Sequence, residues 1–143
     1  MAAGTQISVD EYLRTRYRPD CDYVGGEVVE RNFGEREHSS TQREILFYLG
    51  DHYPALRKRL LPEQRVQVAA TRFRIPDICV LSAGAPWEKI IMTPPALCIE
   101  ILSPEDIMSR TMERIRDYFP MGVPTCWIID PIGREGGSPR RGS

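Results

Sequence analysis

Two apolar segments of this chain each contain one acidic residue where a buried strand is expected. The first is RIPDICVL, residues 74–81, in which Asp77 follows Pro76 and precedes a run of apolar residues. The second is LCIEILS, residues 97–103, in which Glu100 lies between two isoleucines. Proline fixes φ and lacks a backbone donor, so Pro76 is unsuited to the middle of a central strand. A buried carboxylate is costly unless it is paired or binds a metal, and this cost constrains the fold.

The remaining pattern predicts helices and strands that alternate along the chain. Helices are expected at 8–15, where Ser8 and Glu11 have capping-box spacing, at 38–53, and from Ser103 to about 120. Strands are expected in a hairpin within 18–32, in two strands of 64–82 joined near 70–71, at 96–103 and at 125–131. This order predicts an α/β (α+β) domain with a mixed central β-sheet flanked by α-helices.

Length and composition limit the classes of protein that fit. With 143 residues, the chain is expected to form one domain over 1–131, and its Gly-, Arg- and Ser-rich tail at 132–143 is expected to be disordered. Nineteen basic and 20 acidic residues argue against a strongly basic nucleic-acid binder, although a local basic face is compatible with them. The sequence has no apolar run of about 20 residues and no signal-peptide pattern, so we expect a cytoplasmic protein without membrane contact.

The two embedded acids have three interpretations. Each could lie at a strand end or on an exposed face, with no role beyond solvation, or both could be structural and ion-paired with arginines. If the two strands are neighbours and the acids face the same way, Asp77 and Glu100 would attract Mg²⁺ or Mn²⁺, which favour oxygen ligands. A metal held there is suited to phosphodiester hydrolysis. Arg114, at the edge of the apolar stripe of the following helix, could then lean toward the sheet and stabilise phosphate charge, or simply lie along the helix flank.

Five sequence blocks in order carry a resemblance to a known family. They are YVGGEVVERN, EHSSTQ, PEQRVQVAATRFRIPDICVL, PPALCIEILSPED and ERIRDYFPMGVPTCWIIDP. Together they cover roughly residues 8–131, and they resemble the Uma2 family of restriction-endonuclease-like proteins in the PD-(D/E)xK nuclease superfamily. The resemblance implies a restriction-endonuclease-like core, a metal-dependent endonuclease activity, and a nucleic-acid partner, most simply DNA. A homodimer is also expected, because paired cuts need two active sites.

The family motif is carried over residue by residue, with one departure. Pro76 and Asp77 match its "PD", Glu100 matches its "(D/E)", and Leu102 stands where the motif has lysine. In Uma2-like proteins a lysine of the following helix is thought to substitute, and Arg114 occupies that position here. Arginine keeps the charge and can grip a phosphate, but it does not readily lose a proton. Two functions therefore stay open: an active endonuclease, or an inactive nuclease fold that binds nucleic acid or protein.

Further polar residues are accessory candidates. Glu30 and His38 could add an acid or a phosphate contact, although His38 also fits a helix start or a surface position. Gln67 is expected on the strand beside that of Asp77, where it could equally be a satisfied polar residue. Arginines could line a groove for a phosphate backbone, or lie on solvated faces. These arginines are Arg72, Arg74, Arg110, Arg114 and Arg116.

Overall fold

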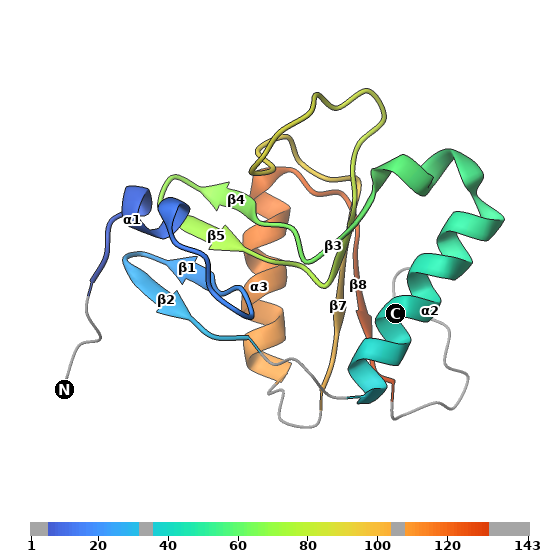
Figure 1. Cartoon of the computed structure of the whole chain (residues 1–143), viewed down its shortest axis with the longest axis horizontal. Helices are drawn as coiled ribbons and strands as arrows, with labels where there is room; N and C mark the ends of the chain where they lie inside the picture. The colour runs from blue at the N-terminus through green and yellow to red at the C-terminus, as the bar shows by residue number, and fades with distance from the viewer. Residues whose placement is uncertain (1–5, 32–35, 104–107, 132–143) are drawn as a thin grey trace.

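The computed structural model describes residues 6–31, 36–103 and 108–131, and these form two four-stranded sheets with helices (Figure 1). The first sheet has the strand order β2-β1-β5-β4, and all its neighbouring strands are antiparallel. Its strands are β1 (Asp22–Val24), β2 (Glu27–Val29), β4 (Val66–Ala69) and β5 (Arg72–Arg74). The β1–β2 turn uses Gly25 and Gly26, which both have positive φ, as the sequence predicted for a Gly-Gly hairpin.

The second sheet is mixed and has the order β3-β6-β7-β8. Its strands are β3 (Leu60–Pro62), β6 (Ile78–Val80), β7 (Leu97–Ile101) and β8 (Cys126–Ile129). The pairs β3–β6 and β6–β7 are antiparallel, whereas β7 and β8 run parallel and are connected through α3 (Met108–Met121). Such a crossover helix is what a parallel pair requires. The predicted mixed sheet with flanking helices is confirmed.

Two helices cover opposite faces of the second sheet. α2 (Arg36–His52) packs Leu49 against Ile78 and Ile99, and α3 packs Ile115 and Tyr118 against the cysteines at 79 and 98. This division follows from the alternation of side chains along each strand. In Figure 1, α3 stands between the two sheets and α2 lies on the far side of the second. Within the described residues, no helix is long and apolar enough to cross a membrane.

The short N-terminal helix matches its prediction. α1 (Val9–Arg14) begins after Ser8, whose side chain accepts a hydrogen bond of 3.0 Å from the backbone N–H of Glu11. The helix expected at 38–53 is α2, which begins two residues earlier and is followed by a 3-10 helix, Pro54–Arg59. The expected start of the last helix at 104–107 and the tail at 132–143 lie outside the described residues.

Two features of the sheets differ from the prediction. Residues 64–82 form three strands rather than two, because the chain leaves the first sheet after β5 and enters the second at β6. Pro76 lies at this break, where its missing N–H and fixed φ interrupt the ladder. Strand β3 was not predicted, and it pairs antiparallel with β6.

Candidate active site

Asp77 and Glu100 lie at the same end of the β6–β7 pair. The antiparallel register ends where Ile78 pairs with Ile99; Asp77 directly precedes β6, and Glu100 is the next residue along β7. The backbone N–H of Ile101 donates a 2.7 Å hydrogen bond to Asp77 Oδ2. Each of these acids is only 3% exposed, and the charge of Asp77 acts on Glu100. The structure thus brings together the two embedded acids.

Asp77 is held as a carboxylate by a set of donors. Its Oδ1 lies 3.1 Å from Arg31 Nη2 and 3.2 Å from His38 Nε2. Burial alone would raise its pKa, but the hydrogen bond and charge of His38, with Arg31 and the Ile101 N–H, hold the pKa below its ordinary value. The same hydrogen bond raises the pKa of His38. Gln42 of α2 also donates to the Asp77 carbonyl, at 2.8 Å.

Glu100 has the opposite electrostatic character. Burial raises its pKa to about 7, and the nearby charge of Asp77 adds to this. Arg114 Nη2 lies 3.4 Å from its Oε1, and the Tyr118 hydroxyl donates a 2.6 Å hydrogen bond to its Oε2; both contacts act to lower the pKa. The pKa of Asp77 is therefore lowered and that of Glu100 is raised, and opposite shifts in neighbouring acids are a pattern found at functional sites.

Arg114 leans from α3 toward the end of the sheet. Besides Glu100, its Nη2 contacts the carbonyl of Ile75, to which it donates a 2.9 Å hydrogen bond. Its Nε is buried and makes no hydrogen bond, although it lies 3.6 Å from Asp22 Oδ2. Of the two positions that the sequence left open for Arg114, these contacts correspond to the one that leans toward the sheet.

A third buried acid, Asp22, belongs to the same cluster and was missed in the sequence. Its Oδ1 accepts a 3.0 Å hydrogen bond from the Ile75 N–H, and its Oδ2 accepts one of 3.3 Å from Arg74 Nη1. Asp22 begins β1, and β1 pairs with β5, which leads into the segment before Asp77. The local sequence did not single it out, because Asp20 stands two residues earlier and Asp22 reaches the cluster through the pairing of β1 with β5.

Comparison with known proteins was made on the sequence and on the fold. The sequence model of the Uma2 family, described as "Putative restriction endonuclease", matches residues 9–136. The chain belongs to the Uma2 family. A solved structure titled as a "putative nuclease belonging to DUF820" from Anabaena variabilis ATCC 29413 has a TM-score of 0.73 and 24% sequence identity, covering 87% of this chain and 74% of that chain. At that identity the likeness shows the shared fold. No curated protein matches the chain.

Two of the arginines suggested for a phosphate groove in this Uma2 chain are directed at protein carboxylates. Arg74 is buried and pairs with Asp117 at 2.7 Å and with Glu113 at 2.9 Å, and Arg72 lies 3.1 Å from Asp117. Both acids belong to α3, so these pairs attach the first sheet to that helix. Arg110 is exposed on α3 and keeps a surface charge.

The accessory candidates separate into near and distant residues. His38 is buried against Asp77, rather than at the surface. Glu30 is exposed and lines a small cavity together with Arg31. Gln67 is not on the strand beside that of Asp77, because β4 pairs with β5 in the first sheet, and its side chain donates to the Ala70 carbonyl at 3.3 Å.

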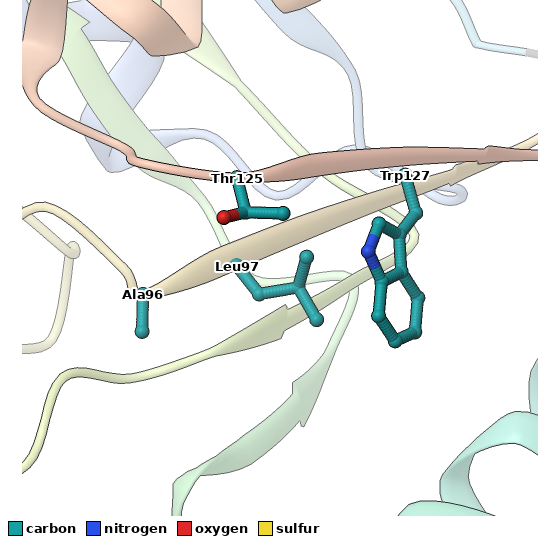
Figure 2. A pocket seen from close by; sticks show the side chains of 4 residues that line it. All are labelled: Ala96, Leu97, Thr125 and Trp127. Carbon is teal, nitrogen blue, oxygen red and sulfur yellow. The ribbon is translucent and has the colours of Figure 1, made fainter. Parts of the chain in front are cut away.

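A larger cavity, of about 420 Å³, lies elsewhere on the Uma2 fold. Figure 2 shows its lining at the start of β7 and β8, formed by Ala96, Leu97, Thr125 and Trp127. Leu97 and Trp127 pack with the core beneath α2, and alternation along β7 sets Glu100 on the other face of the sheet. The described lining of this cavity holds no acid or base, in contrast to the Asp77–Glu100 cluster.

The donor set of the Uma2 site is suited in type to a hard divalent cation. Mg²⁺ is commonly bound by one or two carboxylates, with water and substrate phosphate completing its coordination. Asp77 and Glu100 supply two such carboxylates from neighbouring strands. Within the described ranges, no group of three or more His, Cys, Asp and Glu side chains is arranged to hold a metal ion. Asp77 and Glu100 are therefore the residues that could contribute carboxylates to a Mg²⁺ or Mn²⁺ site, with water and phosphate completing it.

Proposed function

We propose that this protein is a divalent-metal-dependent endonuclease that hydrolyses phosphodiester bonds of nucleic acid. Asp77 and Glu100 would hold Mg²⁺ or Mn²⁺, and Arg114 would bind the scissile phosphate. The observation that supports this most strongly is the placement of the two acids across β6 and β7, with Arg114 beside Glu100. Membership in a family described as a restriction endonuclease agrees with the same chemistry.

Each residue of the proposed site has its own role in hydrolysis. A bound Mg²⁺ or Mn²⁺ supplies Lewis acidity toward the phosphate and lowers the pKa of a water. Arg114 carries a fixed positive charge, and its planar fork can donate two hydrogen bonds to a phosphate. It stabilises charge and does not remove a proton. Asp77 keeps its negative charge through its lowered pKa, and Tyr118 orients Glu100.

The substrate and assembly follow from this chemistry. The family suggests nucleic acid as the partner, and we propose DNA, with two copies of the chain acting together when both strands are cut. A cytoplasmic location, where DNA is accessible, is part of the same proposal.

A second candidate function is an inactive nuclease fold that binds nucleic acid or protein. It is favoured by Arg114, which stands where the family is expected to have lysine and cannot act as a base at neutral pH. The structure adds that Arg31 and His38 already engage Asp77. The first candidate remains the better supported, because both acids are retained and are buried close enough for the charge of Asp77 to act on Glu100.

Calorimetric titration of Mn²⁺, combined with a plasmid-nicking assay, tests the proposal. We expect the wild-type protein to bind Mn²⁺ and to nick plasmid DNA only with metal present, and Asp77→Asn and Glu100→Gln to lose both properties. Asp51→Asn is the matched control, since its carboxylate is exposed on α2 and pairs only loosely with Arg57. Metal binding without nicking would favour the inactive fold, and absence of metal binding would refute the proposed site.

Arg114→Lys separates the two candidate functions further. Lysine can lose a proton when its pKa is lowered, which arginine cannot. If the active site is intact apart from this residue, Arg114→Lys should nick plasmid faster than the wild-type protein under the same metal concentration. An unchanged rate would show that arginine does not limit cleavage.

A further inference from the structure

Arg31 is the most deeply placed cation beside the proposed metal ligands. Its side chain is 3% exposed, and its Nη2 lies 3.1 Å from Asp77 Oδ1. Its Nε is 3.8 Å from Asp22 Oδ1, and its Nη1 is 3.8 Å from Glu63 Oε1. The guanidinium therefore occupies the space among three carboxylates, which is the kind of environment a divalent cation also favours.

The protein satisfies this guanidinium poorly. Its Nε and Nη1 are buried and make no hydrogen bond in the structure. The two 3.8 Å contacts are ion pairs that are too long for hydrogen bonds. A buried donor that lacks an acceptor carries a desolvation cost. Arg31 is thus held by one hydrogen bond, of 3.1 Å from its Nη2 to Asp77 Oδ1, and otherwise by long ion pairs, and this makes it replaceable by another cation.

The charge of the cluster supports the same conclusion. Three buried acids, Asp22, Asp77 and Glu100, are contacted by three arginines and, at Asp77, by His38. The arginines are Arg31, Arg74 and Arg114, and Arg74 is also paired with Glu113 and Asp117. Asp77 Oδ1 is shared by Arg31 and His38, so a divalent ion that binds there meets positive charge unless a cation moves away or an anion enters with the ion. Substrate phosphate can supply the anion, whereas without nucleic acid a cation must move away from the carboxylate.

Arg31 also has space into which it can move. It lines a cavity of about 330 Å³ together with Tyr17, Arg18, Pro19, Cys21 and Glu30. Glu30 is exposed, and its carboxylate offers an alternative acceptor on the cavity wall. Arg74, in contrast, is bound to Glu113 and Asp117 by short hydrogen bonds, and Arg114 is anchored to a backbone carbonyl.

We propose that Arg31 is an internal counter-ion that competes with the divalent metal for Asp77 and leaves the carboxylate when the metal binds. The inference rests on the proposed function, because it assumes that Asp77 is a metal ligand. It makes Arg31 a residue that sets metal affinity: weak for the protein alone, and stronger when substrate phosphate joins the site.

Calorimetric titration of Mn²⁺ into the wild-type protein, Arg31→Gln and Arg31→Lys tests the competition, without nucleic acid and without an activity readout. Arg31→Gln removes the competing charge, so its affinity for Mn²⁺ should rise by roughly tenfold or more. Arg31→Lys keeps the charge and should bind much as the wild-type protein does. Equal or weaker binding by Arg31→Gln would overturn the inference while leaving the metal site intact. If no variant binds Mn²⁺, the proposed metal site fails, and this inference fails with it.

An NMR measurement on the wild-type protein avoids dependence on the folding of a variant. The buried Arg31 Nε–H should exchange slowly with solvent in the metal-free protein, and its signal can be assigned by its loss in Arg31→Lys. Titration with diamagnetic Mg²⁺ should accelerate that exchange and shift the signal as the guanidinium leaves Asp77. A signal that stays unchanged while the Asp77 and Glu100 resonances respond to Mg²⁺ would overturn the inference.

Discussion

The Tyr118 hydroxyl donates a 2.6 Å hydrogen bond to Glu100 Oε2, and both side chains are buried between α3 and the second sheet. This contact ties the crossover helix to the strand that carries one of the two embedded acids. It also opposes the effect of burial on the pKa of Glu100. The position of the acid therefore depends on the packing of α3, as well as on the register of β7.

Removing this hydroxyl should destabilise the protein in a way that depends on the charge of Glu100. We expect Tyr118→Phe to lower the free energy of unfolding by roughly 1.5–3 kcal/mol at pH 8, where Glu100 is ionised, and by about 1 kcal/mol at pH 5.5. Urea denaturation at the two pH values measures the difference. Tyr53→Phe, at an exposed tyrosine, should have little effect at either pH. A loss that is equal at both pH values would contradict the charge-assisted bond.

The raised pKa of Glu100 predicts how stability changes with pH. Its pKa is about 7 in the folded protein against an ordinary value of 4.5, so between these values the folded state binds the extra proton. Stability from this group is therefore highest below about pH 4.5 and falls as the pH rises to about 7, by on the order of 3 kcal/mol. His38, whose pKa is also raised, adds a loss in the same direction as the pH rises through its folded pKa.

Glu100→Gln isolates this contribution. The variant should lose less stability than the wild-type protein between pH 5 and pH 7, because the amide does not titrate. Asp77 acts in the opposite sense: its pKa is lowered, so its stabilising effect disappears as the pH falls below about 4. Urea midpoints at pH 5, 6, 7 and 8 for both proteins provide the measurement. Parallel curves would show that Glu100 does not titrate in this range.

Local patterns predicted most of the elements, but the sheets depend on distant contacts. The capped helix at Ser8 and the Gly-Gly hairpin are encoded by adjacent residues, and both were predicted. The apolar alternation of 64–82 does not show that the chain changes sheets at Pro76, because that depends on which strands pair with β5 and β6. Strand β3 has only three residues and follows a basic segment, so periodicity could not reveal it.

The same limit applies to the site. Asp77 and Glu100 could be selected because each interrupts an apolar run, and Arg114 because it lies at the edge of a helix stripe and at a family position; the structure places Arg114 at Glu100 and the charge of Asp77 nearby. Asp22 and Arg31 join them only through tertiary packing. Asp22 reaches the site through the pairing of β1 with β5, and Arg31 resembles an ordinary polar residue after a hairpin.

Asp22 should prove essential to the fold around the site. It is almost fully buried, and Asp22→Asn would remove the carboxylate charge that faces Arg31, Arg74 and Arg114 while keeping the size of the side chain. Removing one partner of a buried ion pair typically costs about 3–5 kcal/mol, and we expect a loss of that size in urea denaturation. Asp51→Asn changes an exposed carboxylate and should alter stability by less than about 0.5 kcal/mol. Similar small losses for both variants would show that Asp22 is dispensable.

The arginines of the suggested phosphate groove should differ in their effect on DNA binding. Arg110 is exposed on α3, whereas Arg72 lies 3.1 Å from Asp117 and already has a carboxylate partner. If the surface near α3 contacts the phosphate backbone, Arg110→Ala should weaken binding to duplex DNA and reduce the slope of log affinity against log salt by about 1. Arg72→Ala should leave that slope nearly unchanged, because the charge of Arg72 is already paired with Asp117.

Fluorescence anisotropy with a labelled duplex at several salt concentrations measures both slopes. It should be done in the absence of divalent metal, so that cleavage does not interfere with binding. Arg43→Ala serves as the surface control, because Arg43 is exposed on α2, next to Glu44. A smaller salt slope for Arg43→Ala or Arg72→Ala than for Arg110→Ala would place the phosphate contacts on a different face. Equal slopes for all four proteins would mean that none of these arginines contacts phosphate, and the search for the DNA surface would then turn to the residues around Arg114.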